Sequence, residues 1–321
     1  MSQYPRNGML AVVADPELPG RFQLREVDAP MPRDNEALVA VKAFSLNAGE
    51  VRDALSSATV TRPGWDLAGV VERPAANGAG PAKGARVVGL SMRGGAWAQR
   101  VSVPADALAV LPEGVSHADA STLPVAGLTA LYGLAKAGAL LGRDVLVTGA
   151  SGGVGRFVCR LAALSGASVT AVVRSPDVEA QLRADGVGEV IVGEPAQLKA
   201  RGSRYAFVFD TLGGASLAQS LAVLAKGGMC VVCGNSAEQP TTFDARSFYH
   251  QGRVALMGLY LGAELDQRPA CEGLSVLARL VDDGRLRPPI EAEASWSEIA
   301  EVAERLTRRG IRGKAVLHVE G

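Results

Sequence analysis

Glycines are concentrated directly after a short apolar run in the middle of the chain. Residues 145–148 (VLVT) have the composition of a buried strand, and residues 149–155 (GASGGVG) follow at once. From Val154 to Ala162 apolar residues recur at three- and four-residue steps, which predicts a helix. A strand, a glycine turn and a helix N-terminus bring unpaired N–H groups and the positive end of the helix dipole to one point, where glycine permits close approach. This arrangement suits a pyrophosphate.

The end of the next predicted strand bears on which dinucleotide binds. That strand covers residues 167–173 and ends at Arg174 and Ser175, about where this type of fold places the acid that holds an NAD ribose. The nearest carboxylate is that of Asp177. Arg174 can pair with a 2′-phosphate and Ser175 can donate a hydrogen bond to it, so the sequence favours NADPH over NADH. The alternative is that Arg174 is a solvated arginine at a strand end.

Apolar strand candidates continue through this part of the chain, mostly separated by helical or helix-length segments such as Leu217 to Leu224. Alternation of this kind predicts an α/β fold with a doubly wound parallel sheet and helices on both faces. The predicted strands are Val145–Thr148, Ser168–Val173, Glu189–Val192, Tyr205–Asp210, Met229–Cys233 and Val254–Tyr260.

Residues 1–120 have a different texture, with short alternating runs such as LAVVAD and FQLREVD between Gly, Pro, Asn and Asp. This spacing predicts a small, partly open β-barrel. Residues 120–139 are rich in Ala and Leu and predict one or two helices. Residues 121–262 form the predicted dinucleotide-binding domain, and residues 263–321 are expected to return to the first domain. That tail is predicted to contain helices at 272–282 and 297–308 and strands at 289–292 and 313–319.

Composition limits the class of protein. The 321 residues are enough for two domains, and 33 basic against 33 acidic residues give no indication of a nucleic-acid or membrane partner. Four cysteines in a chain this long do not indicate a disulfide framework, which fits a reducing compartment. No stretch has the pattern of a signal peptide or a transmembrane span, so a soluble cytoplasmic protein is expected.

Several segments, taken with their order and spacing, give the chain a resemblance to a known family. It resembles the medium-chain dehydrogenase/reductase superfamily, specifically its zinc-independent quinone oxidoreductase and enoyl reductase branch. The resemblance implies a GroES-like, partly open β-barrel catalytic domain built from both chain ends, a central Rossmann domain, and a cleft between them. The segments are SLNAGE (45–50), PGWDLAGVV (63–71), LPVAGLTAL (123–131), VLVTGASGGVG (145–155), FDTLGG (209–214), GGMCVVCG (227–234) and GKAVL (313–317).

The resemblance also bears on zinc. In zinc-dependent relatives two cysteines and a histidine occupy the places that match Asn47, Trp65 and Val125, and neither tryptophan nor valine can ligate zinc. Cys230 and Cys233 lie three apart in a predicted strand, so they are expected to point to opposite faces as buried thiols. The three histidines are expected at surface or core positions. Hydride transfer from NADPH to a quinone or an α,β-unsaturated carbonyl is the chemistry that remains.

The resemblance assigns a catalytic or ring-contacting role to few residues. Asn47 would lie beside the nicotinamide and Thr129 would contact the cofactor near that ring; the alternatives are a strand-end turn residue and a helix residue bonded to its own backbone. Where many quinone reductases of this branch carry a tyrosine, this chain has Arg52, which could stabilise an enolate oxygen but is a poor proton donor. Solvent or Tyr260 would then supply the proton.

The resemblance implies further cofactor contacts along the second domain. The glycine turn would cradle the pyrophosphate, the segments after the fourth and fifth strands would lie along the adenosine and close over the cofactor, and the segment after the sixth would meet the carboxamide. These residues are Gly149, Ser151, Gly152, Gly153, Val154, Leu212, Gly234, Asn235, Gly258, Leu259 and Tyr260.

Other interpretations remain open at this stage. Arg52 could instead pair with Glu50 or Asp53, and Trp65 and Trp97 could form an aromatic wall for a flat acceptor or pack in the core. The apolar run RVALMGLYL (253–261) is expected to be a sheet edge that pairs in a homodimer, as in relatives. The alternative functions are an NADPH-binding sensor or structural protein without turnover and a zinc alcohol dehydrogenase.

Overall fold

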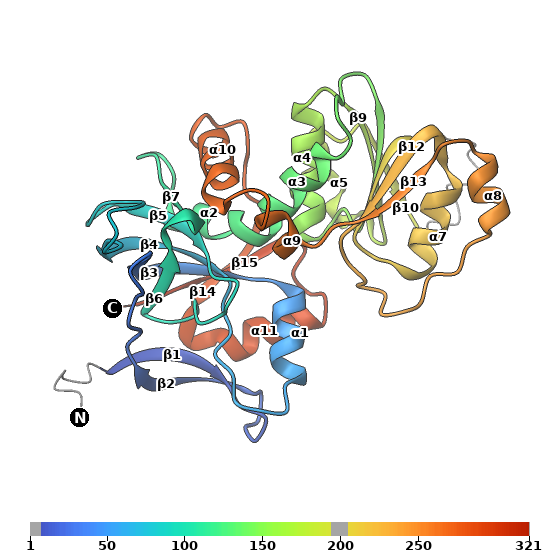
Figure 1. Ribbon diagram of the computed structural model, residues 1–321. Helices are drawn as coiled ribbons and strands as arrows, with labels where there is room; N and C mark the ends of the chain where they lie inside the picture. Colours follow the sequence, from blue (N-terminus) through green and yellow to red (C-terminus); the bar gives the residue numbers. More distant parts are fainter. Residues whose placement is uncertain (1–7, 194–204, 321) are drawn as a thin grey trace. The chain divides into compact units, whose positions relative to one another are not determined.

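The computed structural model describes residues 8–193 and 205–320, and its chain divides into two compact units (Figure 1). The first unit comprises the chain up to Leu128 and again from Leu265, and the second comprises Thr129–Glu264. Each unit has its own β-sheet, which confirms the α/β class with a Rossmann sheet and a separate barrel-like sheet.

The second unit contains a six-stranded sheet in the order β10-β9-β8-β11-β12-β13, in which all neighbouring strands are parallel. This is the doubly wound order of a dinucleotide-binding domain, and its direction reverses between β8 and β11. The predicted parallel sheet is confirmed. The strands are β8 (Asp144–Thr148), β9 (Ser168–Val173), β10 (Glu189–Val192), β11 (Tyr205–Asp210), β12 (Leu224–Val232) and β13 (Ala255–Gly258).

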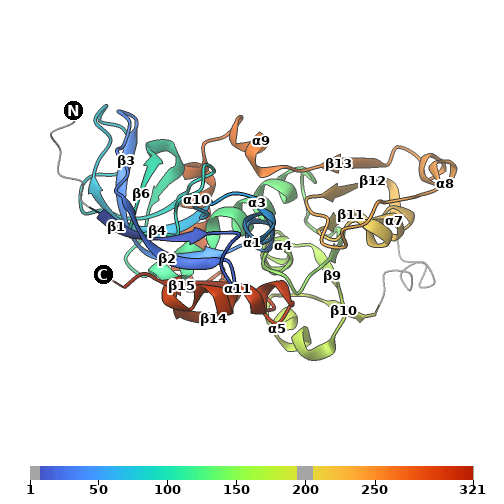
Figure 2. The ribbon, with the colours of Figure 1, turned by 90° about the horizontal axis from the view of Figure 1, so that it is seen from below.

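Helices cover both faces of this sheet. In Figures 1 and 2, α4 (Gly153–Leu164) and α5 (Glu179–Ala184) lie on one side and α7 (Gly214–Ala222) and α8 (Ala245–His250) on the other. The apolar stripe of α4 predicted from the sequence is buried and includes Phe157, Val158 and Leu161. The unit also contains α3 (Leu128–Ala135), the short 3₁₀ helix η3 (Pro176–Val178) and α9 (Leu261–Leu265).

The boundaries around the fifth strand differ from prediction. The strand was predicted at 229–233, but β12 begins at Leu224, which pairs with Tyr205, and ends at Val232. An irregularity in the ladder carries the exposed Gly227 between the two paired stretches, which hides the strand start from a pattern search. The preceding helix, predicted at 217–224, is α7, which begins earlier because Gly213 adopts a φ of 71° at its N-cap.

The first unit is built around the long strand β3. Its first half pairs with β6 and its second half pairs with β15, so a strand from the C-terminal end of the chain completes the sheet. The seven-stranded sheet contains β3 (Glu36–Leu46), β4 (Asp66–Arg73), β5 (Arg86–Leu90), β6 (Arg100–Pro104), β7 (Leu108–Val110), β14 (Ile290–Ser295) and β15 (Lys314–His318), and β1 (Gly8–Ala14) with β2 (Phe22–Asp28) forms a separate hairpin.

Aromatic packing fills the core of this unit. Trp97 is fully buried, stacks on Phe44 with 5.6 Å between ring centroids, and meets Phe22 edge-on. Of the two interpretations of Trp97, packing in the core is therefore confirmed, whereas Trp65 is partly exposed. Helices α1 (Ala48–Ser56) and α11 (Ile299–Thr307) lie side by side in Figures 1 and 2.

The predicted helical stretch 120–139 has three parts. These are α2 (His117–Ser121), the π-helical turn η2 (Leu123–Gly127) and α3. Because η2 packs against β4, β5 and α10 (Ala270–Asp282), the first unit extends past the predicted boundary at residue 120 as far as Leu128.

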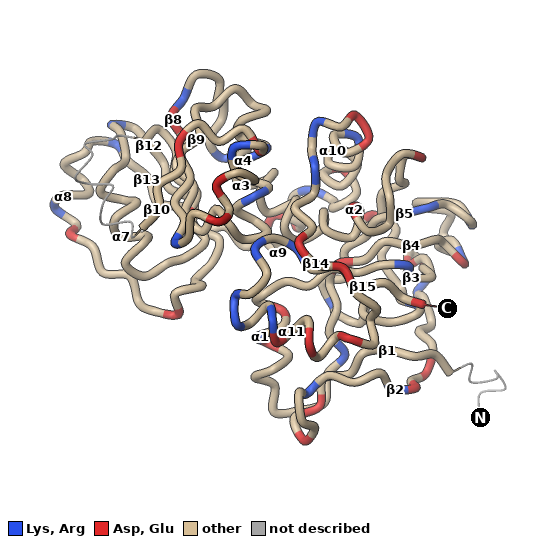
Figure 3. Tube along the Cα trace, turned by 180° about the vertical axis from the view of Figure 1, so that it is seen from behind, with Lys and Arg blue, Asp and Glu red and all other residues tan. Residues whose placement is uncertain are grey.

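Charged residues of both signs are intermixed along the described trace (Figure 3). Within residues 8–193 and 205–320, none of the helices combines the length and the apolar character needed to cross a membrane.

Candidate functional site

The glycine-rich loop 149–155 joins the carboxyl end of β8 to α4. Gly152 is the N-cap of α4 and has no side chain to cap it, and the N–H of Arg156 is the first to bond backwards, to the Gly152 carbonyl. In the described chain, the N–H groups of residues 153–155 therefore have no backbone partner, at the positive end of the helix dipole. Residues 151–154 are partly exposed, so an anionic ligand can reach them.

Two glycines of this loop occupy places where a side chain would not fit. A Cβ on Gly149, whose φ is 63°, would lie 2.1 Å from Thr211 Oγ1, and a Cβ on Gly155 would lie 2.3 Å from the Gly149 carbonyl oxygen. Glycine at residue 149 therefore lets the loop pass close to the end of β11, and glycine at residue 155 lets the start of α4 pack on the loop itself. Close backbone approach combined with free N–H groups fits a pyrophosphate, so the residues present fit a dinucleotide cofactor.

A buried carboxylate joins the two strand ends at which the order of the sheet reverses. Asp210 is fully buried at the end of β11, and its Oδ2 accepts from the Thr148 hydroxyl at 2.5 Å and the Ser216 hydroxyl at 2.9 Å. Its Oδ1 accepts from the N–H groups of Leu212 at 3.1 Å and Gly213 at 2.7 Å. Sequence reasoning gave Asp210 no role, although an acid at the end of an apolar strand was the available signal.

Arg174 and Ser175 follow β9 at the carboxyl edge of the same sheet. Arg174 is exposed, and its guanidinium has no hydrogen bond or ion pair within residues 8–193 and 205–320. The Ser175 hydroxyl caps η3 by accepting from the Asp177 N–H at 3.4 Å, which leaves its own proton to donate. Both side chains that a 2′-phosphate would need are available there.

The segments after β11 and β12 lie against each other. The N–H of Ala237 donates to the Leu212 carbonyl at 2.8 Å, and a Cβ on Gly234 would lie 2.7 Å from the Thr211 carbonyl oxygen. Leu212, Gly234 and Asn235 are therefore brought together near the end of β11, and Asn235 is exposed.

The remaining predicted cofactor residues differ in availability. Thr129 is buried in α3. In the segment 258–260, the Leu259 N–H donates to the Val232 carbonyl at 2.8 Å and the Tyr260 carbonyl accepts from the Ala263 N–H at 3.1 Å. These two backbone groups are engaged within the protein, whereas the Tyr260 side chain is 69% exposed.

The first unit contains a second buried carboxylate with several donors. Asp66, at the start of β4, accepts at Oδ2 from Lys314 Nζ at 3.1 Å and Asn47 Nδ2 at 2.9 Å, with Ser45 Oγ at 2.7 Å. Its Oδ1 accepts from the Val125 N–H at 2.9 Å. Asp66 and Lys314 are 0% and 2% exposed, so this is a buried ion pair whose polar atoms are bonded in return.

Asn47 is fixed by this network. Its Oδ1 accepts from Lys314 Nζ at 2.6 Å, and its Nδ2 donates to Asp66 and, at 3.4 Å, to Glu50 Oε2. Asn47 follows the last residue of β3 and occupies the N-cap of α1 without a side-chain cap bond. The amide therefore has one orientation in which both ends are bonded, and its remaining acceptor lone pair faces no described donor.

Glu50 carries a proton at neutral pH. Burial, followed by the charge of Asp66, raises the pKa of Glu50 from 4.5 to about 8, although Lys314 opposes the shift. Its Oε1 accepts from the Gly64 N–H at 3.0 Å. At neutral pH the network therefore contains one positive and one negative charge, from Lys314 and Asp66. Sequence reasoning gave Glu50 no more than a possible pairing with Arg52, and it gave Asp66 and Lys314 no role.

The predicted catalytic residues Arg52 and Tyr260 belong to different units. Arg52 is exposed on α1 in the first unit, and Tyr260 follows β13 in the second.

The side chains that could act as metal ligands are dispersed over the described residues. Over residues 8–193 and 205–320 no group of three or more His, Cys, Asp or Glu side chains could hold a metal ion. Burial raises the pKa of Cys233 to about 12 and raises that of Cys230 as well. Cys230 lies in β12 and Cys233 just beyond its end, and His318 bonds Glu293 at 2.7 Å.

A doubly wound sheet with a glycine cradle, joined to a barrel-like unit made from both chain ends, defines a two-domain dinucleotide-binding protein. A family model described as zinc-binding dehydrogenase matches residues 153–275. The chain is 29% identical over 298 residues to a chloroplast envelope quinone oxidoreductase homolog of Arabidopsis thaliana, over 85% of this chain and 88% of that protein.

Two further similarities extend over most of the chain. It is 26% identical over 309 residues to a 2-methylene-furan-3-one reductase of Solanum lycopersicum, over 91% of this chain and 74% of that protein. The solved structure of the quinone oxidoreductase from Coxiella burnetii matches with a TM-score of 0.84 and 27% identity, over 98% of this chain and 100% of that one. Together these similarities support the medium-chain dehydrogenase/reductase superfamily, and within it the quinone oxidoreductase branch.

Proposed function

We propose that the protein is a zinc-free, NADPH-dependent oxidoreductase that reduces a quinone or an α,β-unsaturated carbonyl. The observation that carries the proposal is the glycine cradle at the reversal point of the sheet, together with Arg174 at the end of β9, which has no partner among the described residues. Two of the relatives are named for quinones and a third for a 2-methylene-furan-3-one, whose C=C bond is conjugated to a ketone.

The residues have separate tasks in this proposal. Bound NADPH would supply the hydride. The N–H groups of residues 153–155 would hold its pyrophosphate, and Arg174 with Ser175 would hold its 2′-phosphate. A conjugated acceptor needs hydrogen-bond donors at its developing oxyanion rather than a metal, and the Arg52 guanidinium is suited to that role. Since arginine does not give up a proton at neutral pH, the proton would come from solvent or from Tyr260.

The zinc-free part of the proposal is supported by residue chemistry. By resemblance to the zinc-dependent relatives, the zinc ligands would stand at Asn47, Trp65 and Val125. The match to the zinc-binding dehydrogenase model covers residues 153–275 and includes none of these three positions. Neither tryptophan nor valine can ligate zinc, so two of these three positions lack a ligand.

Turnover can be tested by following NADPH oxidation spectrophotometrically with a panel of quinones and enones. Oxidation with at least one acceptor is expected. If NADPH binds but no acceptor is reduced, the alternative of a cofactor-binding protein without turnover gains support. If neither NADPH nor NADH binds, both functions are excluded.

The cofactor preference can be tested separately with Arg174→Asp. Loss of a charge-assisted bond to the 2′-phosphate should raise the Kd for NADPH by about tenfold or more and leave that for NADH within about twofold. Arg246→Asp, at an exposed arginine on α8 of the same unit, is the matched control for charge. An unchanged ratio of the two Kd values would exclude a role for Arg174.

We further propose that the protein is a homodimer joined through β13. The sheet order leaves β13 at an edge, and Leu256 and Met257 on it are 39% and 37% exposed. Sedimentation equilibrium should show a dimer that Met257→Lys converts to a monomer; a wild-type monomer at micromolar concentration would refute the proposal. A cytoplasmic location stays a prediction.

A further inference from the structure

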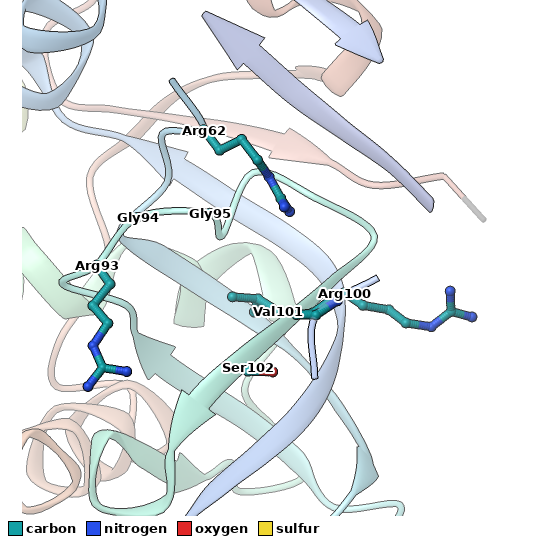
Figure 4. Close-up of a pocket in the computed structure, with 8 residues that line it drawn as sticks. Arg62, Arg93, Gly94, Gly95, Arg100, Val101 and Ser102 are labelled. Atoms are coloured by element: carbon teal, nitrogen blue, oxygen red, sulfur yellow. The ribbon is translucent and has the colours of Figure 1, made fainter. Parts of the chain in front are cut away.

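A pocket of about 260 Å³ opens in the first unit, at a place where no residue assigned above to a cofactor or an acceptor lies. Figure 4 shows the pocket with the residues that line it. Arg62 lies just before β4, Gly94 and Gly95 form the turn after β5, and Arg100 and Ser102 belong to β6. The pocket is small enough to enclose a compact polar molecule rather than a dinucleotide.

The three arginines around the pocket differ in their partners. Arg93 Nη1 lies 2.8 Å from Glu36 Oε1, and Arg100 Nε lies 2.8 Å from Glu72 Oε2. In Figure 4 the heads of these two arginines point away from each other. Each positive charge is therefore matched within the protein, and their side chains contribute mainly apolar stems to the wall.

Arg62 is different. Its guanidinium has no hydrogen bond and no ion pair with any residue in 8–193 or 205–320. Figure 4 shows its side chain extending from the backbone towards β6. Although the residue is exposed as a whole, neighbouring protein atoms desolvate the guanidinium enough to lower the pKa of Arg62. A partly desolvated charge without a counter-charge is a cost that an anionic ligand would offset.

The wall of the pocket also contains an unsatisfied hydroxyl. Ser102 Oγ is buried and has no hydrogen-bond partner among residues 8–193 and 205–320. Buried hydroxyl groups are usually bonded, so an unsatisfied one beside a polar pocket indicates a missing acceptor. An oxygen of an anion is such an acceptor, since the serine hydroxyl donates to it while the guanidinium supplies the charge.

The backbone holds the arginine in place. The Gly95 N–H donates to the Arg62 carbonyl at 2.9 Å, and a Cβ on Gly94, whose φ is 82°, would lie 2.8 Å from the same carbonyl oxygen. The turn therefore packs on the Arg62 backbone only with glycine at residue 94. The backbone of Arg62 is therefore held in a fixed position by the turn at Gly94 and Gly95.

We propose that this pocket binds a small oxyanion, a phosphoryl or carboxylate group, with Arg62 as the charged contact and Ser102 as a hydrogen-bond donor. The site lies wholly in the first unit, and it does not depend on the oxidoreductase function proposed above. The group could belong to a free anion or to one end of a larger organic molecule, since the same chemistry recognises both.

The test is an NMR titration of the full-length protein, observing the backbone amides of Gly94 and Gly95. Inorganic phosphate and benzoate are added separately at constant ionic strength, with sodium chloride as the third arm. Saturable shifts are expected with at least one of the two oxyanions. Saturation with phosphate alone indicates a phosphoryl group, and saturation with benzoate alone indicates the carboxylate of an organic molecule.

Variants decide whether the named side chains are responsible. Arg62→Gln should raise the Kd at least about tenfold and Ser102→Ala about threefold. Arg287→Gln, at an exposed arginine of the same unit outside the pocket, should leave the Kd unchanged. Shifts that do not saturate beyond those with chloride would overturn the proposal, as would a Kd that Arg62→Gln leaves unaltered. Phosphate binding at the glycine cradle is read separately from the amides of residues 152–154.

Discussion

Replacing Glu50 by glutamine should remove a pH dependence from the stability of the first unit. Glu50 is 3% exposed, and burial together with the charge of Asp66 raises its pKa from 4.5 to about 8. At neutral pH the folded protein therefore holds a proton that the unfolded chain releases. Stability should fall as the pH rises above the unfolded-state pKa, and the fall should end once the pH passes the folded-state pKa.

The size of the effect follows from the shift. A proton bound only in the folded state lowers the free energy of unfolding by about 1.4 kcal/mol for each pH unit. Between pH 6 and pH 8, with a folded-state pKa of about 8, the contribution of Glu50 is roughly 2 kcal/mol, because the carboxyl is half ionised at the upper limit. Glutamine keeps an oxygen for the Gly64 N–H but does not titrate. The free energy of unfolding of Glu50→Gln, relative to that of wild type, should therefore rise by about 2 kcal/mol as the pH goes from 6 to 8.

Urea denaturation followed by tryptophan fluorescence measures this difference in the correct part of the molecule. The three tryptophans, Trp65, Trp97 and Trp296, all belong to the first unit. Unfolding curves of wild type and Glu50→Gln are compared at several pH values in that interval. Glu301→Gln serves as control, because Glu301 is an exposed glutamate on α11 of the same unit.

A difference in unfolding free energy that stays constant between pH 6 and pH 8 would refute the reasoning. It would mean that Glu50 is ionised throughout that interval in the folded protein, so that the network would carry two negative charges and one positive. The Glu301→Gln control should show no change with pH over the same interval.

Three further predictions concern the Asp66 network, the glycine loop and zinc. Lys314→Met should lower the free energy of unfolding by about 3–5 kcal/mol, measured as above, because Asp66 would remain buried without its counter-charge. Gly155→Ala should raise the Kd for NADPH at least tenfold in a fluorescence titration, because the added Cβ would lie 2.3 Å from the Gly149 carbonyl oxygen. Gly188→Ala is the control: its added Cβ would have its nearest contact at 3.6 Å, so the Kd for NADPH should not change. Elemental analysis of the purified protein should find well under one zinc per chain, and treatment with a chelator should leave NADPH oxidation unchanged; stoichiometric zinc would contradict the first of these.

The Rossmann sheet could be predicted because its strands are buried on both faces. β9, β10 and β11 have the predicted boundaries, and each is a short run of mostly apolar residues that a period search detects. β12 was placed too late because the ladder irregularity between Leu224 and Met229 contains Lys226 and two glycines, which have the composition of a turn. The apolar sequence pattern therefore identified β12 but not the residue at which it begins, because that residue is determined by pairing with β11.

The polar network of the first unit could not be predicted from local pattern. Lys314 and Asp66 are 248 residues apart and meet only because β15 and β4 both pair with β3. A charged residue beside an apolar run is compatible with a solvated strand end as well as with a buried ion pair, and the sequence does not distinguish them. The sequence left two alternatives open for Trp97 for a related reason, since its aromatic neighbours Phe22 and Phe44 come from other strands.

The segments that carry the family resemblance converge on two buried carboxylates, one in each unit. Asp66 joins SLNAGE, LPVAGLTAL and GKAVL to its own segment through Asn47, Val125 and Lys314.

Asp210 does the same in the second unit, where it joins the end of β8 to FDTLGG. A buried carboxylate that accepts several hydrogen bonds fixes each donor segment, because leaving any one unpaired is costly. Changes within one cluster should therefore combine non-additively, while changes in different clusters share no partner and should add. On this argument, the recurring motifs of the chain mark the places where distant segments must be held together, and only some of them mark contacts with a ligand.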